Sequence, residues 1–248
     1  MKYVYGIAAL FMVVSGLIYW LYPVAVVTDM LAVIAALLAF GAALYTWQRV
    51  KISKKEGLVW LLLSLGIFLW LMGETLWFYL ETVTGEPPFP SVADYCWLLG
   101  YPVLFLAFYS EYRRLGVTLD MKKKWGAFLL VIAAGLIMVW VLLYDIASSP
   151  DVSTVEKFLD IAYPIGDLAL FCVVLLVSFV YLGGRLGRAW LIISLGFVLH
   201  SFADLAFSYL QWEETYWSGH PIDLLWLLGY SVVFVGAYLY RHAYEKIM

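Results

Sequence analysis

Long apolar runs separated by short polar stretches make up almost the whole chain. Each run holds about 20 residues, which is the length that an α-helix needs to cross the hydrocarbon core of a bilayer. The pattern predicts eight transmembrane helices, at residues 3–22, 24–48, 57–82, 92–112, 125–145, 155–182, 188–212 and 221–241. We therefore expect an all-α, multi-pass bundle whose main partner is the lipid bilayer of the cell membrane.

Charged residues in the connecting loops predict how the bundle is oriented. When alternate loops are grouped, 14 of the 15 Lys and Arg residues fall on one side, and only Lys157 falls on the other. Because cytoplasmic loops of membrane proteins carry an excess of Lys and Arg, the basic side is expected to face the cytoplasm. Both termini would then be cytoplasmic, and the outer face would be acidic.

The second half of the sequence repeats the first. The string from Trp60 to Gly66 returns from Trp190 to Gly196, at an offset of 130 residues. After a one-residue deletion in an outer loop, the pattern Asp-x-x-Trp-Leu-Leu-Gly-Tyr occurs at 94–101 and again at 223–230. We predict two four-helix repeats, residues 1–122 and 123–248. An even number of spans in each repeat makes the repeats parallel, related by an axis near the membrane normal.

Six acidic residues fall within or at the mouth of the apolar segments, all in the outer half of the predicted membrane. They are Asp29, Glu74, Asp94, Asp167, Asp204 and Asp223. Carboxylates are costly in hydrocarbon, and no Lys or Arg occupies these depths to neutralise them. The acids are therefore expected to be protonated, to face a wet cavity or to bind a cation. The alternative is that protonated acids and tyrosines join helices by hydrogen bonds and serve folding alone.

Aromatic residues share helical faces with these acids. In the first repeat Asp94, Trp97 and Tyr101 are spaced i, i+3, i+7, and in the second repeat the corresponding residues are Asp223, Trp226 and Tyr230. Aromatic rings beside carboxylates attract organic cations, so the pattern predicts a pocket for a small extracellular cationic ligand. The alternative is an aromatic belt at the membrane interface. We assign to the belt Trp20, Tyr22, Trp77, Tyr79, Trp212 and Trp217.

His200 stands where the first repeat has Trp70, one helical turn before Asp204. Together with Asp167, His200 and Asp204 would supply three ligands for a divalent metal, so a membrane metallohydrolase is a third interpretation. Nucleotide-binding and serine-hydrolase motifs are absent from the sequence. A retinal Schiff base is excluded, because no lysine lies within a core segment. The basic run at 122–124 is explained by topology and anionic lipid, and not by nucleic-acid binding.

Composition agrees with a membrane protein and adds two expectations. The chain is 65% hydrophobic and 13% charged, which excludes an ordinary soluble globular protein. Asn is absent and Gln occurs twice, a scarcity of thermolabile amides that is typical of thermophiles. Cys96 and Cys172 lie in apolar segments and are expected to be buried small side chains and not a disulfide.

One motif resembles a known family. The pattern Gly-Glu-x-x-Trp-x-x-x-Glu at 73–81, then Pro-Phe-Pro-Ser-x-Ala-Asp at 88–94 and Tyr101-Pro102, is similar to multi-span membrane sensor regions. Such regions precede diguanylate cyclase or histidine kinase domains in bacterial and archaeal signalling proteins. Tyr163-Pro164-x-Gly-Asp at 163–167 resembles a second element of the same regions. The resemblance implies a role in signal transduction. Because no output domain follows the eighth segment, it also implies a separate cytoplasmic signalling partner.

These observations leave three interpretations open. The leading one is a membrane sensor or binding module, in which the ligand neutralises paired acids and changes the packing of the two repeats. The second is a cation- or proton-coupled carrier that uses the same acids for coupling. The third is the metallohydrolase. The first two are not enzymes.

Overall fold

The computed structural model describes residues 2–85, 89–116, 120–140, 144, 153–181 and 185–247. Every regular element in these ranges is a helix, so the all-α prediction is confirmed there. The elements are α1 (Lys2–Leu21), α2 (Ala25–Val50), α3 (Lys54–Tyr79), the π-helical turn η1 (Leu80–Thr84), α4 (Val92–Leu115), α5 (Met121–Met138), α7 (Thr154–Val180), α8 (Arg185–Trp212) and α9 (Asp223–Tyr244).

Seven of the described helices are long and apolar enough to cross a membrane, namely α1, α2, α3, α4, α7, α8 and α9. They support a multi-pass membrane protein. The continuous apolar part of α5 that the structure describes is shorter, Phe128–Met138. The predicted fifth segment continues to residue 145, and residues 141–143 and 145 lie outside the described part of the chain. The eighth span therefore remains a prediction.

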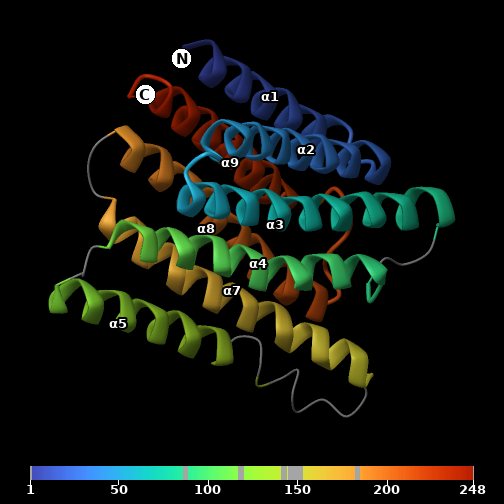
Figure 1. Cartoon of the computed structure of the whole chain (residues 1–248). Helices are drawn as coiled ribbons and strands as arrows, with labels where there is room; N and C mark the ends of the chain where they lie inside the picture. Colours follow the sequence, from blue (N-terminus) through green and yellow to red (C-terminus); the bar gives the residue numbers. More distant parts are fainter. Residues whose placement is uncertain are drawn as a thin grey trace.

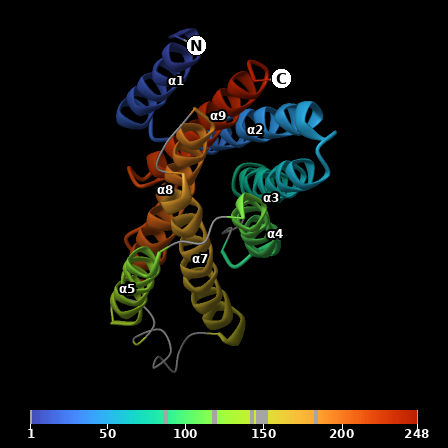
Figure 2. The same cartoon turned by 60° about the vertical axis from the view of Figure 1, so that its left-hand side comes forward.

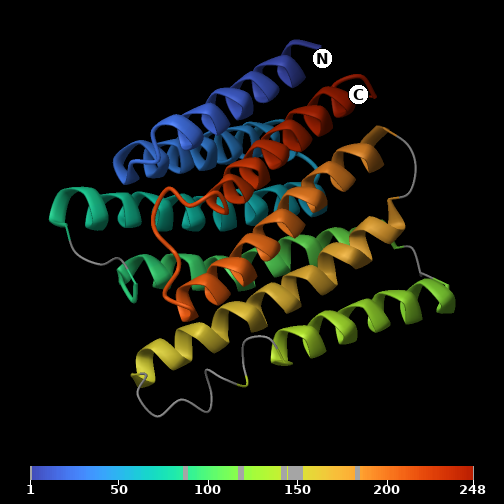
Figure 3. The same ribbon diagram turned by 180° about the vertical axis from the view of Figure 1, so that it is seen from behind.

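Six of the described helices form a closed ring (Figures 1 and 2). Around the ring α2 packs on α3, α3 on α4, α4 on α7, α7 on α8 and α8 on α9, and α9 packs back on α2. Two further helices lie outside: α1 packs against α9 and α2, and α5 packs against α7 (Figure 3). Polar side chains on the inner faces of the ring helices can point away from lipid.

The two ends of the bundle differ in charge. Both termini lie at the same end of the bundle (Figure 1). Basic residues gather there, because Arg49 lies in the last turn of α2, Arg113 and Arg114 in that of α4, and Arg241 in that of α9. The opposite end carries η1, the start of α4 and the loop from α8 to α9.

Aromatic side chains fill the ring at the end that holds the termini. Trp60 and Trp190, which are equivalent positions of the sequence repeat, meet with ring centroids 5.8 Å apart. Tyr240 packs on both, at 4.8 and 6.2 Å. All three side chains are completely buried. We call Trp60, Trp190 and Tyr240 the aromatic plug, because together they occupy this end of the ring.

Two buried glutamates, which the sequence analysis did not single out, join helices beside the plug. The Tyr240 hydroxyl of α9 donates to Glu56 of α3. Similarly, the Tyr181 hydroxyl, at the end of α7, donates to Glu111 of α4. Glu111 also receives two hydrogen bonds from Arg114, each of 2.7 Å.

Candidate functional site

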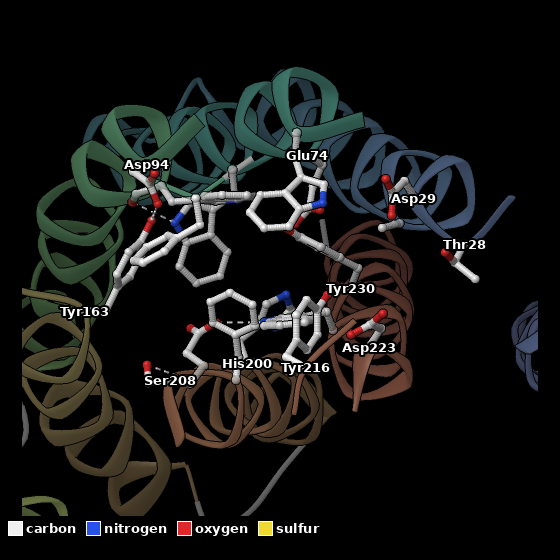
Figure 4. A pocket seen from close by; sticks show the side chains of 18 of the residues that line it. Thr28, Asp29, Glu74, Asp94, Tyr163, His200, Ser208, Tyr216, Asp223 and Tyr230 are labelled. Carbon is white, nitrogen blue, oxygen red and sulfur yellow. Dashed lines mark hydrogen bonds between the residues drawn. The ribbon is translucent and has the colours of Figure 1, made fainter. Parts of the chain in front are cut away.

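A cavity lies inside the ring, in the half that is farther from the termini. It encloses about 830 Å³ of empty space, its open mouth included, and Figure 4 looks into it. Ten of the predicted site residues line it: Asp29, Glu74, Asp94, Trp97, Tyr101, His200, Asp204, Asp223, Trp226 and Tyr230. Asp167 lies one layer behind, where it lines a second and smaller cavity, and its Oδ1 is 3.1 Å from the Tyr101 hydroxyl oxygen. The structure therefore brings ten of the eleven predicted residues into one cavity, with Asp167 next to it.

Two acids deep in the cavity are joined to the other half of the chain by matching hydrogen bonds. The Tyr101 hydroxyl of α4 donates to Asp204 Oδ2 of α8 at 2.9 Å. The Tyr230 hydroxyl of α9 donates to Glu74 Oε1 of α3 at 2.9 Å. Tyr101 and Tyr230 are equivalent in the repeat, and so are Glu74 and Asp204. Each half thus supplies a tyrosine to the deep acid of the other half.

Each deep acid also meets a tryptophan from its own half. Trp226 Nε1 donates to Asp204 Oδ1 at 2.7 Å, so both oxygens of Asp204 accept a hydrogen bond. Its counterpart Trp97 lies within hydrogen-bonding reach of Glu74. Tyrosine and tryptophan hydrogens therefore already occupy much of the accepting capacity of these two carboxyl groups.

Asp94 is satisfied in a similar way at the mouth. Its Oδ2 accepts the backbone N–H of Ser91 at 2.6 Å as part of a capping box that starts α4. Its Oδ1 accepts the Tyr163 hydroxyl of α7 at 2.6 Å. Asp94 therefore helps to cap α4 and also joins it to α7.

The floor of the cavity is formed by Trp70 and His200, which occupy equivalent positions of the sequence repeat but are different residue types. Trp70 and His200 face each other with ring centroids 5.0 Å apart. Each ring lies over a glycine of the next helix. A Cβ atom at Gly100 would be 2.4 Å from the Trp70 ring, and one at Gly229 would be 2.3 Å from the His200 ring. Glycine is required at both positions, because any side chain would push the floor residue out of place.

His200 does not join a metal site. Its Nδ1 lies 2.9 Å from the Gly196 carbonyl oxygen, which can only accept, so Nδ1 carries the proton and Nε2 is a bare acceptor. Nε2 is buried without a partner. Within the described residues, no three His, Cys, Asp or Glu side chains are arranged to hold a metal ion. The proposed ligand set of His200, Asp204 and Asp167 is thus not assembled.

The aromatic wall contains residues that the sequence analysis placed elsewhere or missed. Phe207 packs against Trp77, Phe89, Tyr216 and Trp226, with centroid distances from 4.7 to 6.2 Å. We assigned Trp77 to the interfacial belt, but it lines the cavity. A signal existed in the sequence. Trp77 and Phe207 each lie three residues after a deep acid, so they share its helical face.

Belt candidates other than Trp77 differ in exposure. Trp20, Tyr22, Tyr79 and Trp217 are exposed, and Trp212 is half-buried. The two cysteines, Cys96 and Cys172, are free thiols and are half-buried, less enclosed than we expected.

One side of the cavity, between α2 and α9, keeps unpartnered acceptors. Asp29 Oδ2 and Asp223 Oδ1 are buried and receive no hydrogen bond. The other oxygen of Asp223 accepts the Gly219 backbone N–H at 2.9 Å. In Figure 4 Asp29 and Asp223 lie on the same side of the cavity, across from Asp94 and Tyr163. Asp94 and Asp204 thus have a hydrogen-bond donor for both carboxyl oxygens, whereas Asp29 and Asp223 each have one oxygen without a donor.

Tyr216 of the loop between α8 and α9 lines the cavity near these two acids, and His220 of the same loop lies three residues before Asp223. Burial, with Asp223 and Asp29 close by, raises the pKa of the Tyr216 hydroxyl well above its usual range. Tyr216 therefore stays a neutral donor. Partial burial lowers the pKa of His220 below its usual range, which favours a neutral ring. No positive charge from these two side chains competes for the carboxyl groups.

The chain was compared with known proteins. No protein-family model, no curated protein and no solved structure matches it.

Proposed function

We propose that the protein is a membrane sensor that binds a small organic cation in the cavity of its helix ring. One observation carries the proposal. Five different ring helices each contribute a carboxyl group to one cavity, and no described lining residue is a lysine or arginine. The contributing acids are Asp29, Glu74, Asp94, Asp204 and Asp223.

Electrostatics explains why a cation suits this cavity. A carboxylate without a counter-charge is costly to bury, and a bound cation removes part of that cost. The aromatic walls exclude water and offer ring faces, each of which can add about 0.5–2 kcal/mol of cation–π attraction. An anion would meet repulsion from every carboxylate, and a neutral ligand would leave the charge uncompensated.

The proposal includes the eight-span topology with two parallel repeats, 1–122 and 123–248. The reciprocal bonds of Tyr101 to Asp204 and Tyr230 to Glu74 support it, because they are what a two-fold axis between such repeats would produce. In this arrangement the cavity opens outside the cell and both termini are cytoplasmic. A bound cation would change how the two repeats pack against each other and alter the cytoplasmic loops, which a separate signalling partner would detect.

A cation- or proton-coupled carrier is the second candidate, and one observation favours it. A single hydroxyl, that of Tyr101, contacts both Asp204 and Asp167 at the boundary between the halves. Protonation of either acid would change this contact, as coupling requires. A carrier would also need to open the end of the ring that is filled by the aromatic plug.

Ligand binding to the purified protein in lipid nanodiscs tests the proposal. We expect 2-phenylethylamine, a cation with an aromatic ring, to bind at least ten-fold more tightly than 2-phenylethanol or 3-phenylpropionate, measured by calorimetry. Empty nanodiscs correct for partition into lipid. Equal binding of the neutral alcohol, or failure of every organic cation tried, would overturn the proposal.

Transport measurements separate the two candidates. A sensor is expected to bind the amine without moving radiolabelled amine into proteoliposomes, with or without a pH gradient. Accumulation that follows the gradient and is lost on Asp204→Asn would identify a carrier instead.

A further inference from the structure

We infer that the positive group of the ligand binds between Asp29 and Asp223, and that it is an ammonium group carrying N–H donors. The inference rests on the proposed function and assigns a subsite and a chemical class within the cavity. The subsite is not formed by Glu74 and Asp204, although these two equivalent acids are the most prominent ones in the sequence repeat.

The deep acids are poor candidates for the charged group, since protein donors already reach them. Both oxygens of Asp204 accept protein hydrogen bonds, from Tyr101 at 2.9 Å and from Trp226 at 2.7 Å. Glu74 accepts from Tyr230 at 2.9 Å. A ligand binding there would have to displace bonds that join the two halves of the ring.

Among the acids that line the cavity, Asp29 and Asp223 each have a buried oxygen that receives no hydrogen bond, although the Tyr216 hydroxyl lies within hydrogen-bonding reach of the Asp223 carboxyl group. Asp29 is 9% exposed and Asp223 is 7% exposed, yet each has one buried oxygen without a partner. A buried acceptor that is left unsatisfied costs about 1–3 kcal/mol, more if it is charged. A donor supplied by a ligand removes this cost at both residues.

A third carboxyl group adds negative charge behind the subsite. Glu81 of η1 lies within hydrogen-bonding reach of the Asp29 carboxyl group. It is held by the Ser218 hydroxyl at 2.7 Å. Two carboxyl groups this close share a proton or, when both are ionised, repel each other, and a positive group nearby favours the ionised pair. The local arrangement therefore favours a cation more strongly than any single acid of the cavity does.

Aromatic hydroxyl side chains complete the subsite. Tyr19 of α1 and Tyr216 of the α8–α9 loop both line the cavity close to Asp29 and Asp223. Their rings provide faces for a cation. Within the described residues, no set of three metal-ligating side chains occurs here or elsewhere, so an organic ammonium fits better than a metal ion.

The kind of ammonium follows from the unsatisfied atoms. Carboxylate oxygens without a partner require hydrogens on the ligand nitrogen, which a primary amine supplies and a quaternary ammonium does not. We expect the trimethylammonium analogue of 2-phenylethylamine to bind the wild-type protein at least ten-fold more weakly than the primary amine. Equal affinity of the two compounds would overturn the assignment.

Isosteric variants test the position of the subsite. Asp29→Asn and Asp223→Asn are each expected to weaken 2-phenylethylamine binding at least ten-fold, in calorimetry with protein in nanodiscs. The amide introduced by Asp223→Asn keeps an oxygen that can accept the Gly219 N–H, so the contact between α9 and the preceding loop is retained. Glu213→Gln, which removes an exposed acid from the same outer loop, should leave the affinity unchanged. Thermal unfolding of each variant shows whether a loss of binding reflects a loss of structure.

The outcomes distinguish this inference from the proposed function. Wild-type binding of the amine that is lost on Glu74→Gln but kept on Asp29→Asn and Asp223→Asn would overturn the subsite and leave the proposed function standing. Failure of every organic cation to bind the wild-type protein would instead overturn the proposed function. If either subsite variant does not fold, the comparison of primary and quaternary amines on the wild-type protein still decides.

Discussion

At the scale of single residues, the floor of the cavity depends on two glycines. Gly100 and Gly229 allow the rings of Trp70 and His200 to lie directly on the neighbouring helix backbone. Trp70 is further fixed by its Nε1 hydrogen bond of 3.1 Å to the Trp97 carbonyl oxygen. The position of the floor thus depends on the close approach of neighbouring helices at these glycines, as well as on the Trp70 and His200 side chains.

Gly100→Ala should therefore destabilise the protein. The new Cβ would lie 2.4 Å from the Trp70 ring, which must move and lose its bond to Trp97. We expect a loss of about 1–3 kcal/mol in the free energy of unfolding, measured by SDS titration in mixed micelles. Gly41→Ala in α2 is the control, because nothing lies within 4 Å of a Cβ atom there. Equal stability of both variants would show that the floor is loosely packed.

The sequence predicted which residues meet, but not which of them are free to bind. Helical spacing and loop charge placed Asp94, Trp97 and Tyr101 on one face and at one depth, and these residues do line the cavity. Hydrogen-bond partners come from distant helices, so the sequence could not distinguish satisfied Asp204 from unsatisfied Asp29. The same limitation led us to group His200 with metal ligands.

At the scale of helices, two tyrosine–glutamate contacts hold the ring together near the termini. Tyr240 joins α9 to α3 through Glu56, and Tyr181 joins α7 to α4 through Glu111. The two contacts are not equivalent, because Glu111 keeps two bonds from Arg114 if its tyrosine is lost.

We predict that Tyr240→Phe costs more stability than Tyr181→Phe. Removing the Tyr240 hydroxyl takes a donor from buried Glu56, for an expected loss of about 1–3 kcal/mol. Tyr181→Phe should cost less than half as much, because Arg114 still binds Glu111. Chemical unfolding of both variants in mixed micelles measures the difference, with exposed Tyr109→Phe as the control. A larger loss in Tyr181→Phe would contradict this account.

The positions of the helices along the chain could be predicted from the sequence, but which helices pack against each other could not. The apolar runs predicted α2 at 24–48 and α4 at 92–112, and the helices span Ala25–Val50 and Val92–Leu115. Which helices are neighbours depends on packing between side chains far apart in the sequence. The placement of α1 on α9 and of α5 on α7 also shows that the outer helices of the two predicted repeats pack differently.

At the scale of the whole molecule, charge is segregated between the two ends of the bundle. The end with the termini carries Arg49, Arg113 and Arg241, and the other end carries the cavity with its acids. We expect the basic end to face the cytoplasm.

Cysteine labelling tests this orientation. In a protein carrying Cys96→Ala and Cys172→Ala, we expect Glu213→Cys to react with a membrane-impermeant maleimide on intact cells. Ile52→Cys and Lys246→Cys, at the basic end, should react only after the membrane is permeabilised. Labelling of Ile52→Cys on intact cells would invert the proposed topology, and different behaviour of Ile52→Cys and Lys246→Cys would contradict an even number of spans between them.

The aromatic plug has a kinetic consequence. The three side chains of the plug are fully buried and fill the ring at the basic end, so the cavity is closed at that end and open only at its mouth. A molecule that enters must leave by the same mouth. Arrival and departure then share one barrier, and a bulky compound lodged at the mouth would slow both rates without changing the equilibrium affinity of a smaller ligand already trapped below it.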